Sequence, residues 1–123
     1  MAMNILIGDA QPRVRFGLQL LFEQQADWKV VGEAEDAQAL LEAVRSRCPD
    51  LVLLDWELPG MPAASLVRVL RSQWPHLHVI AMSSLPEARA SAAGAGVEAF
   101  VDKGAPPEAL LAALRKISCL CDV

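Results

Sequence analysis

The sequence predicts an α/β fold, a doubly wound parallel sheet of five strands with five helices on its two faces. Three observations support it. Short apolar runs alternate along the chain with stretches of helical periodicity, which is the order of a parallel sheet with right-handed crossovers. Several of these runs end at a polar residue beside a turn signal. At 123 residues and 54% hydrophobic composition, the chain is large enough for one packed core.

In the first half of the chain, apolar runs predict strands at residues 3–8, 28–31 and 51–54. Pro12 opens the first helix, where its missing N–H would have no partner in any case. Asp36 can cap the second helix through its side-chain oxygen. The apolar faces of the two helices consist of Val14, Leu18, Leu21 and Phe22, and of Leu40, Leu41 and Val44.

The second half continues the alternation of strands and helices. We expect helices at residues 63–74 and 86–93 and strands at 77–82 and 97–101. Gly94 and Gly96 close the fourth helix, since glycine readily adopts the conformation that ends helices. The pair Pro106-Pro107 starts the last helix, whose apolar face carries Leu110, Leu111, Leu114 and Ile117.

Four polar residues end predicted strands. Asp9, Asp55, Ser83 and Lys103 follow the first, third, fourth and fifth apolar runs. The carboxyl ends of parallel strands form one edge of the sheet, and open α/β sheets bind their ligands there. Two carboxylates suit a hard cation such as Mg²⁺. A hydroxyl and an ammonium beside them suit an anionic group carried by one of the acids. The pattern therefore favours an acid that can be phosphorylated.

These strand ends resemble a known family. The segments ILIGDAQP at 5–12, DWELPGM at 55–61, MSS at 82–84 and FVDK at 100–103 look like the receiver domain of two-component response regulators. The resemblance covers nearly the whole chain and is closest to receivers that precede a LuxR-type helix-turn-helix. It implies a flavodoxin-like sheet in the strand order 2-1-3-4-5.

The resemblance also implies a role for each matching residue. Asp55 corresponds to the phospho-accepting aspartate, and Ser83 to the hydroxyl residue that moves toward the phosphoryl group. Lys103 corresponds to the lysine that pairs with that group, and Phe100 to the aromatic switch position that turns inward on activation. The backbone carbonyl of Glu57 corresponds to a metal ligand.

Two departures from the family's pattern stand out. The family usually has two adjacent acids after the first strand, whereas here Asp9 precedes Ala10. We therefore expect a weak Mg²⁺ site made of Asp9, Asp55 and Glu57, whose side chain can lean toward the metal. Beside Ala10, Asp9 can alternatively serve only as a helix cap. The segment between Ser83 and Lys103 is also short, which predicts that the fourth helix or its loop is trimmed.

Three functions compete. The first is a receiver that takes a phosphoryl group onto Asp55 from a histidine kinase or phosphotransfer protein and then changes its affinity for a partner, a second copy being one candidate. Such a domain is a switch in phosphorelay signalling and not an enzyme by role. The second is a pseudo-receiver, an interaction module that works without phosphorylation. The third, a flavodoxin-like enzyme or cofactor binder, is disfavoured because no glycine-rich phosphate loop follows Asp9.

Composition limits the partners and the cellular location that we expect for this chain. A net charge of −4 gives no reason to expect direct nucleic-acid binding by this domain. No apolar run approaches the roughly 20 residues of a membrane span, and no signal peptide is visible. The three cysteines lack zinc spacing and fit a reducing cytoplasm. We expect a receiver domain over 1–118 and a C-terminal tail over 119–123.

Overall fold

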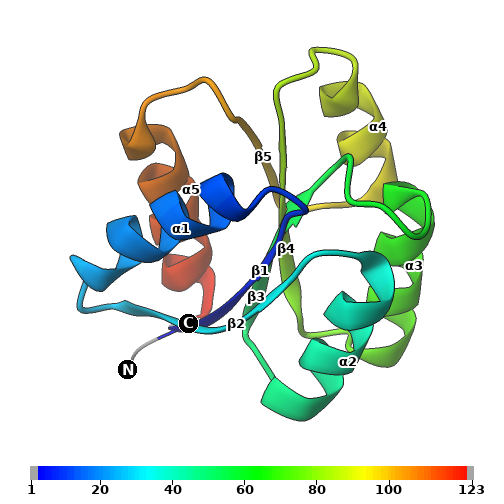
Figure 1. The fold of residues 1–123 in the computed structure, drawn as a ribbon, viewed down its shortest axis with the longest axis horizontal. Helices are drawn as coiled ribbons and strands as arrows, with labels where there is room; N and C mark the ends of the chain where they lie inside the picture. Colours follow the sequence, from blue (N-terminus) through cyan, green and yellow to red (C-terminus); the bar gives the residue numbers. More distant parts are fainter. Residues whose placement is uncertain (1–2, 122–123) are drawn as a thin grey trace.

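The computed structural model describes residues 3–121, and side chains over 3–118. One parallel sheet runs through the molecule in the order β2-β1-β3-β4-β5 (Figure 1). The predicted fold class and strand order are confirmed. The strands are β1 (Met3–Gly8), β2 (Trp28–Ala34), β3 (Leu51–Asp55), β4 (His78–Ser83) and β5 (Ala99–Asp102).

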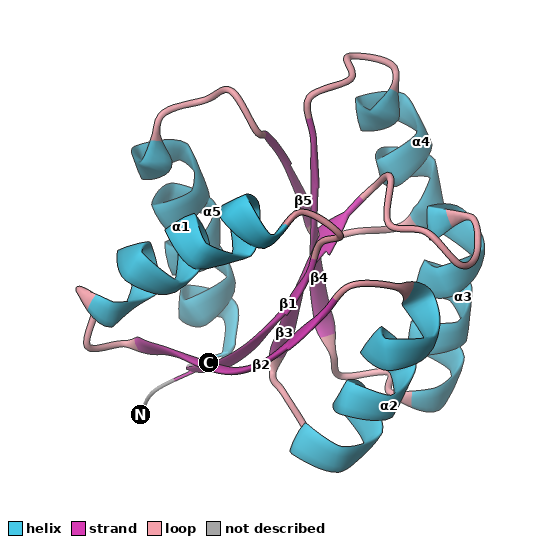
Figure 2. Cartoon of the chain, in the orientation of Figure 1, coloured by secondary structure: helices cyan, strands magenta, loops and turns pink. Residues whose placement is uncertain are grey.

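Helices cover both faces of this sheet. Helices α1 and α5 lie on one face, and α2, α3 and α4 lie on the other (Figures 1 and 2). The right-handed crossovers between parallel strands require helices on both sides once the strand order reverses at β1. The helices are α1 (Pro12–Glu23), α2 (Ala37–Arg47), α3 (Ala63–Gln73), α4 (Ala88–Ala95) and α5 (Pro107–Cys121).

The core is divided in two by the sheet. Successive strand residues point to opposite faces, so Ile5, Ile7 and Leu53 pack with α1 and α5 while Leu6 and Leu54 pack with α2 and α3. All of these side chains are buried. Burying one Leu or Ile stabilises the fold by roughly 1.5–3 kcal/mol. This two-sided burial explains why the sequence of the central strands is continuously apolar.

Strand β3 lies at the centre of the sheet, between β1 and β4, and every one of its residues is buried. The peptide N–H of Trp56 still donates to the carbonyl of Met82, at 2.8 Å. The chain then turns, with the Leu58 N–H bonded to the Asp55 carbonyl at 3.0 Å. Asp55 is thereby fixed at the carboxyl end of the central strand.

Strand β2 is longer than the apolar run that predicts it. The prediction ends at Val31, but the strand continues to Ala34, which pairs with Gly8. The register shifts at this point, because Ile5 pairs with Val30 and the next residue of β1 pairs with Gly32. Pairing with β1 therefore extends an edge strand through polar and glycine residues that carry no apolar signal.

The region around α4 also differs from the prediction. The helix begins at Ala88 and ends at Ala95, so Gly94 lies inside it, and only Gly96, at φ 87°, closes it. The Val97 N–H turns back to the Ala92 carbonyl at 3.4 Å. Val97 therefore completes the helix end, and β5 starts two residues later than predicted, at Ala99.

Cys48 follows the last residue of α2 and adopts the left-handed conformation, at φ 49°. Helix α5 extends into the expected C-terminal tail. The backbone of α5 continues to Cys121. The first three residues of the expected tail are thus helical, and its last two lie outside the described residues. The division between 1–118 and 119–123 stays a prediction.

Candidate functional site

Three buried polar side chains gather at one edge of the sheet. In the described part of the chain, the buried polar or charged residues are Asp9, Asp55 and Ser83, with exposed fractions of 3%, 5% and 0%. Asp9 directly follows β1, and Asp55 and Ser83 are the last residues of β3 and β4, as the sequence predicts. Burying a carboxylate is costly unless it is paired. An arrangement that places two of them together is therefore better explained by a function than by stability.

Lys103 supplies the charge that pairs with both acids. Its Nζ lies 2.7 Å from Asp9 Oδ2 and 3.3 Å from Asp55 Oδ1. Burial of the ammonium favours its neutral form, but the hydrogen bond to Asp9 and the charges of Asp55 and Asp9 outweigh burial and raise the pKa of Lys103. The lysine is thus firmly cationic. The backbone positions it, since the Lys103 N–H donates to the Ser83 carbonyl at 3.0 Å.

The carboxylates of Asp9 and Asp55 differ in how many of their oxygens have a protein partner. Asp9 Oδ1 accepts from the Gln11 N–H at 2.9 Å, so both of its oxygens have protein partners. Asp55 Oδ1 accepts from the Glu57 N–H at 3.0 Å and faces Lys103. Among the described residues nothing donates to Asp55 Oδ2, and this atom is not completely buried. Asp55 therefore keeps one oxygen whose lone pairs are free.

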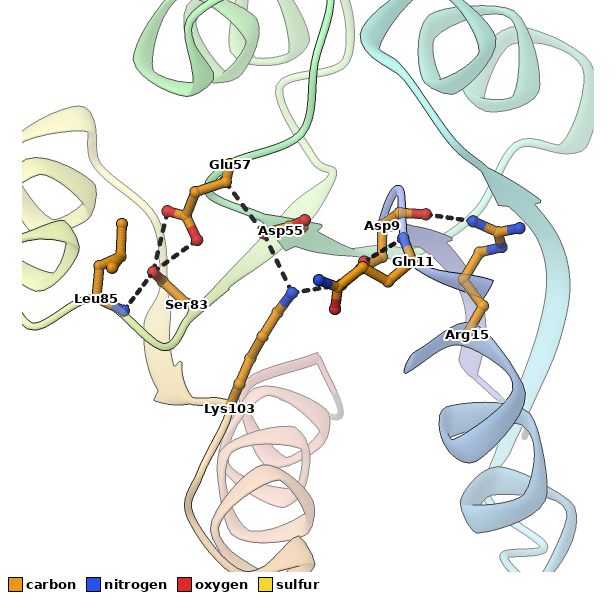
Figure 3. Close-up of polar contacts among 8 residues, drawn as sticks. All are labelled: Asp9, Gln11, Arg15, Asp55, Glu57, Ser83, Leu85 and Lys103. Carbon is orange, nitrogen blue, oxygen red and sulfur yellow. Dashed lines mark hydrogen bonds and ion pairs between the residues drawn. The ribbon is translucent and has the colours of Figure 1, made fainter. Parts of the chain in front are cut away.

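Glu57 and Ser83 form a second polar contact at this edge (Figure 3). The Ser83 hydroxyl lies 2.9 and 3.0 Å from the two oxygens of the Glu57 carboxylate. Ser83 Oγ also accepts from the Leu85 N–H at 2.9 Å. The Glu57 side chain is turned to Ser83 and not to the pair of aspartates.

Arg15 is a site residue that the sequence did not single out. Its Nη1 donates to the Asp9 carbonyl at 2.5 Å, while its Nε pairs with Glu33 at 2.9 Å. Gln19 donates to the other Glu33 oxygen at 2.8 Å. The only sequence signal is the place of Arg15 in the first turn after Asp9. Its partner on β2 is set by tertiary structure.

Phe100 lies beside α4 and is half-buried. The Arg89 guanidinium is 4.7 Å from its ring centroid, a cation–π contact between α4 and β5. The Trp56 Nε1–H donates to the Ser91 hydroxyl of α4 at 3.2 Å. Helix α4, with eight residues the shortest of the five, is therefore tied to the strand ends on both sides of Ser83.

The sequence model of the family described as the response regulator receiver domain matches residues 5–115, which is almost the whole chain. The chain belongs to the response regulator receiver domain family. The resemblance at the strand ends is thereby confirmed. In the part of this receiver that the structure describes, no helix combines the length and the apolarity needed to cross a membrane.

The receiver is similar to curated transcription regulators. It is 32% identical over 117 residues to the transcriptional activator protein ExaE of Pseudomonas putida, covering 94% of this chain and 55% of ExaE. It is 34% identical over 115 residues to the nitrate/nitrite response regulator NarL of Escherichia coli strain K12, covering 92% and 53%. The chain thus spans about half the length of the curated relatives it matches.

Solved structures agree with this relationship. The RcsB response regulator of Salmonella typhimurium superposes with a TM-score of 0.89 at 27% identity, covering 95% of this chain and 61% of that one. The signal receiver domain of the putative response regulator NarL from Mycobacterium tuberculosis gives 0.85 at 28% identity, covering 94% and 95%. A match to a LuxR-family regulator from Aurantimonas, with a TM-score of 0.87 at 28% identity, covers 95% and 85% and fits the predicted subfamily.

The donor set of the receiver fits Mg²⁺. Asp9 and Asp55 both contact Lys103 Nζ, so their carboxylates lie close together at the accessible edge. Mg²⁺ favours oxygen ligands and keeps several waters, which suits two carboxylates and the Glu57 carbonyl. Among the side chains of residues 3–118, however, no three His, Cys, Asp or Glu residues are grouped as a metal site. In this conformation the Glu57 carboxylate does not join the two aspartates.

Proposed function

We propose that Asp55 accepts a phosphoryl group from a histidine kinase or a phosphotransfer protein, with Mg²⁺, and that the modified receiver changes its affinity for a partner. The observation that carries this proposal is the unequal engagement of the two oxygens of Asp55. Oδ1 is held by the Glu57 N–H and Lys103, while Oδ2 is not completely buried and accepts no hydrogen bond from the described residues. A positioned carboxylate with one free oxygen is a suitable nucleophile.

The transfer follows from this geometry. Asp55 Oδ2 attacks the phosphorus of a phosphohistidine, the P–N bond breaks, and its electron pair returns to the imidazole. Asp9, Asp55 and the Glu57 carbonyl would hold Mg²⁺, which would supply positive charge beside the phosphoryl oxygens. Lys103 already carries a positive charge beside Asp55 and pairs with the anionic product. Asp9 is less suited to attack because both of its oxygens are engaged.

The output of the switch is inferred from the family. Similar proteins include the transcriptional activator ExaE and the response regulator RcsB, of which a structure bound to promoter DNA exists. A second RcsB structure contains two dimers bound to two parallel DNAs. We infer a role in transcriptional signalling in the cytoplasm, with a second copy of the receiver as one candidate partner. We do not propose direct contact of this domain with DNA, because its net charge is −4.

Incubation with acetyl phosphate and Mg²⁺, followed by intact mass spectrometry, tests the function. The parent receiver is expected to gain the mass of one phosphoryl group. Asp55→Asn removes the nucleophilic carboxylate with little change of shape and is expected to gain none. The exposed Asp27, changed to Asn, is the matched control and should behave as the parent. A parent protein that takes up no phosphoryl group would instead favour the pseudo-receiver.

A further inference from the structure

The Ser83 hydroxyl has a single proton, and Glu57 holds it. Ser83 is fully buried, its Oγ lies 2.9 and 3.0 Å from the two carboxylate oxygens, and the Leu85 N–H occupies a lone pair of the same Oγ. A hydroxyl has one donor and two acceptor positions, and a carboxylate can only accept. The proton therefore lies between Ser83 and Glu57. It is not available to a group on Asp55 while this contact lasts.

We infer that Glu57 and Ser83 form a latch that stabilises the resting receiver and must open when Asp55 is phosphorylated. This inference rests on the proposed function. A phosphoryl group on Asp55 presents new anionic acceptors, and the Ser83 proton can serve either these or Glu57. The latch thus biases a two-state equilibrium toward the unphosphorylated arrangement, by the free energy of one charge-assisted hydrogen bond.

Glu57 is suited to this role by its position. Its N–H fixes Asp55 Oδ1 at 3.0 Å, so the backbone of the same residue orients the nucleophile while its side chain holds the switch hydroxyl. The residue itself is exposed, so its carboxylate can turn into water once released. The latch is consequently weak enough to open. Glu57 acts through Ser83 and is a positioning residue.

The first test uses beryllium trifluoride with Mg²⁺ as a stand-in for the phosphoryl group and follows Trp56 fluorescence. Glu57→Ala removes the latch and is expected to bind the probe about three- to tenfold more tightly than the parent, the range of one partly exposed hydrogen bond to a charge. Glu57→Gln keeps a carbonyl acceptor for Ser83 but loses the charge of that acceptor, so it is expected to keep part of the latch and to bind the probe within about threefold of the parent, less tightly than Glu57→Ala.

Two controls separate the latch from simple charge repulsion. If the Glu57 charge only repelled the anionic probe, Glu57→Gln and Glu57→Ala would tighten binding equally, and the latch would be refuted. In a Ser83→Ala background no hydroxyl remains to be released, so Glu57→Ala should change affinity by less than about twofold. An undiminished effect in that background, or no effect of Glu57→Ala in the parent, would also overturn the inference.

A second readout needs no phosphoryl group. Without Glu57, the Ser83 side chain is free to rotate away from the Leu85 N–H. Amide hydrogen exchange at Leu85 in the free protein should therefore speed up about three- to tenfold in Glu57→Ala. The Gly104 N–H, held by Asp102 Oδ1 at 2.7 Å, is the internal control and should not change. Unchanged exchange at Leu85 would contradict the latch. If no variant binds the probe but Leu85 exchange responds, the proposed function fails and the latch stands.

Discussion

Lys103 determines the electrostatics of the site at the scale of single residues. One ammonium pairs with two buried carboxylates, at 2.7 and 3.3 Å. Without it, two negative charges would face each other in a partly desolvated site, where repulsion is strong. The same group is expected to pair with the phosphoryl oxygens. Its contribution to stability and its contribution to function can be measured separately.

Replacement of Lys103 by Met should lower the free energy of unfolding by roughly 1–3 kcal/mol, because it leaves buried charge uncompensated. Urea denaturation at neutral pH measures this. The exposed Lys29, changed to Met, is the control, and this change should lower the free energy of unfolding only slightly. Mg²⁺ should restore part of the loss, since a cation can replace the ammonium. Equal stability of parent and Lys103→Met would argue against the pairing.

The effect of Lys103 should depend on pH in a defined direction. Its pKa is raised in the folded protein, so folding favours the protonated form. The stabilisation is complete below the ordinary value of 10.5 and is lost as the pH rises through the higher folded pKa. The stability difference between parent and Lys103→Met should persist at neutral pH and shrink above 10.5. A difference that shrinks toward neutral pH would have the wrong sign.

Ala10 determines how many acids can serve the metal. The neighbouring Asp9 and the more distant Asp55 are the two buried carboxylates in the described part of the chain. Ala10→Asp adds a charge about 4 Å from the metal, so Mg²⁺ should bind roughly ten- to a hundredfold more tightly. A Mg²⁺ titration followed by Trp56 fluorescence measures this. The exposed Ala26, changed to Asp, controls for net charge. Equal affinities for Ala10→Asp and the parent would show that the missing acid does not limit binding.

At the scale of elements, Arg71 joins three parts of the fold at the edge opposite the site. From α3 it donates to the carbonyl of Leu77 at 2.7 Å, before β4, and to that of Gly96 at 2.9 Å, after α4. Arg71 also forms an ion pair with Glu98. The other oxygen of the Glu98 carboxylate lies 2.8 Å from His78 Nδ1, at hydrogen-bond distance. These contacts connect the amino ends of β4 and β5, and thereby support the strands whose other ends carry Ser83 and Lys103.

Replacement of Arg71 by Ala should lower the free energy of unfolding by about 1–2 kcal/mol, because two backbone carbonyls lose a charged donor. Arg71→Lys keeps the charge but not the fork that reaches both carbonyls, and should recover less than half of the loss. Thermal or urea denaturation measures both variants. The exposed Arg68 on the same helix, changed to Ala, is the control. If the Arg71→Ala variant were as stable as the Arg68→Ala variant, this role of Arg71 would be refuted.

Sequence patterns predicted the elements with strong periodicity and missed those that depend on neighbours. Asp36 caps α2 through the Ala39 N–H at 2.8 Å, as its position suggested. The end of β2 and the start of β5 were misplaced. Ala34 joins the sheet because β1 offers a partner, whereas Val97 is used to close α4. Pairing and helix closure are tertiary effects that propensity alone does not encode.

For the whole molecule, the alternating pattern predicted the parallel sheet, while the strand order came from the family resemblance. The four strand-end residues Asp9, Asp55, Ser83 and Lys103 were predicted because the carboxyl ends of parallel strands meet at one edge. The role of Arg15 and the direction of the Glu57 side chain were not, because both depend on partners far away in the sequence. The sequence thus predicted which residues meet, but not their hydrogen bonds.

The most direct measurement is the identity of the residue that carries the phosphoryl group. After incubation with acetyl phosphate and Mg²⁺, borohydride reduces an aspartyl phosphate to homoserine, which peptide mass spectrometry can locate. We predict homoserine at position 55, since Oδ2 of Asp55 is not completely buried and accepts no hydrogen bond from the described residues. Asp9, with both oxygens engaged, should remain unmodified. Homoserine at position 9, or a reduced Glu57 with Asp55 intact, would contradict the central role of Asp55.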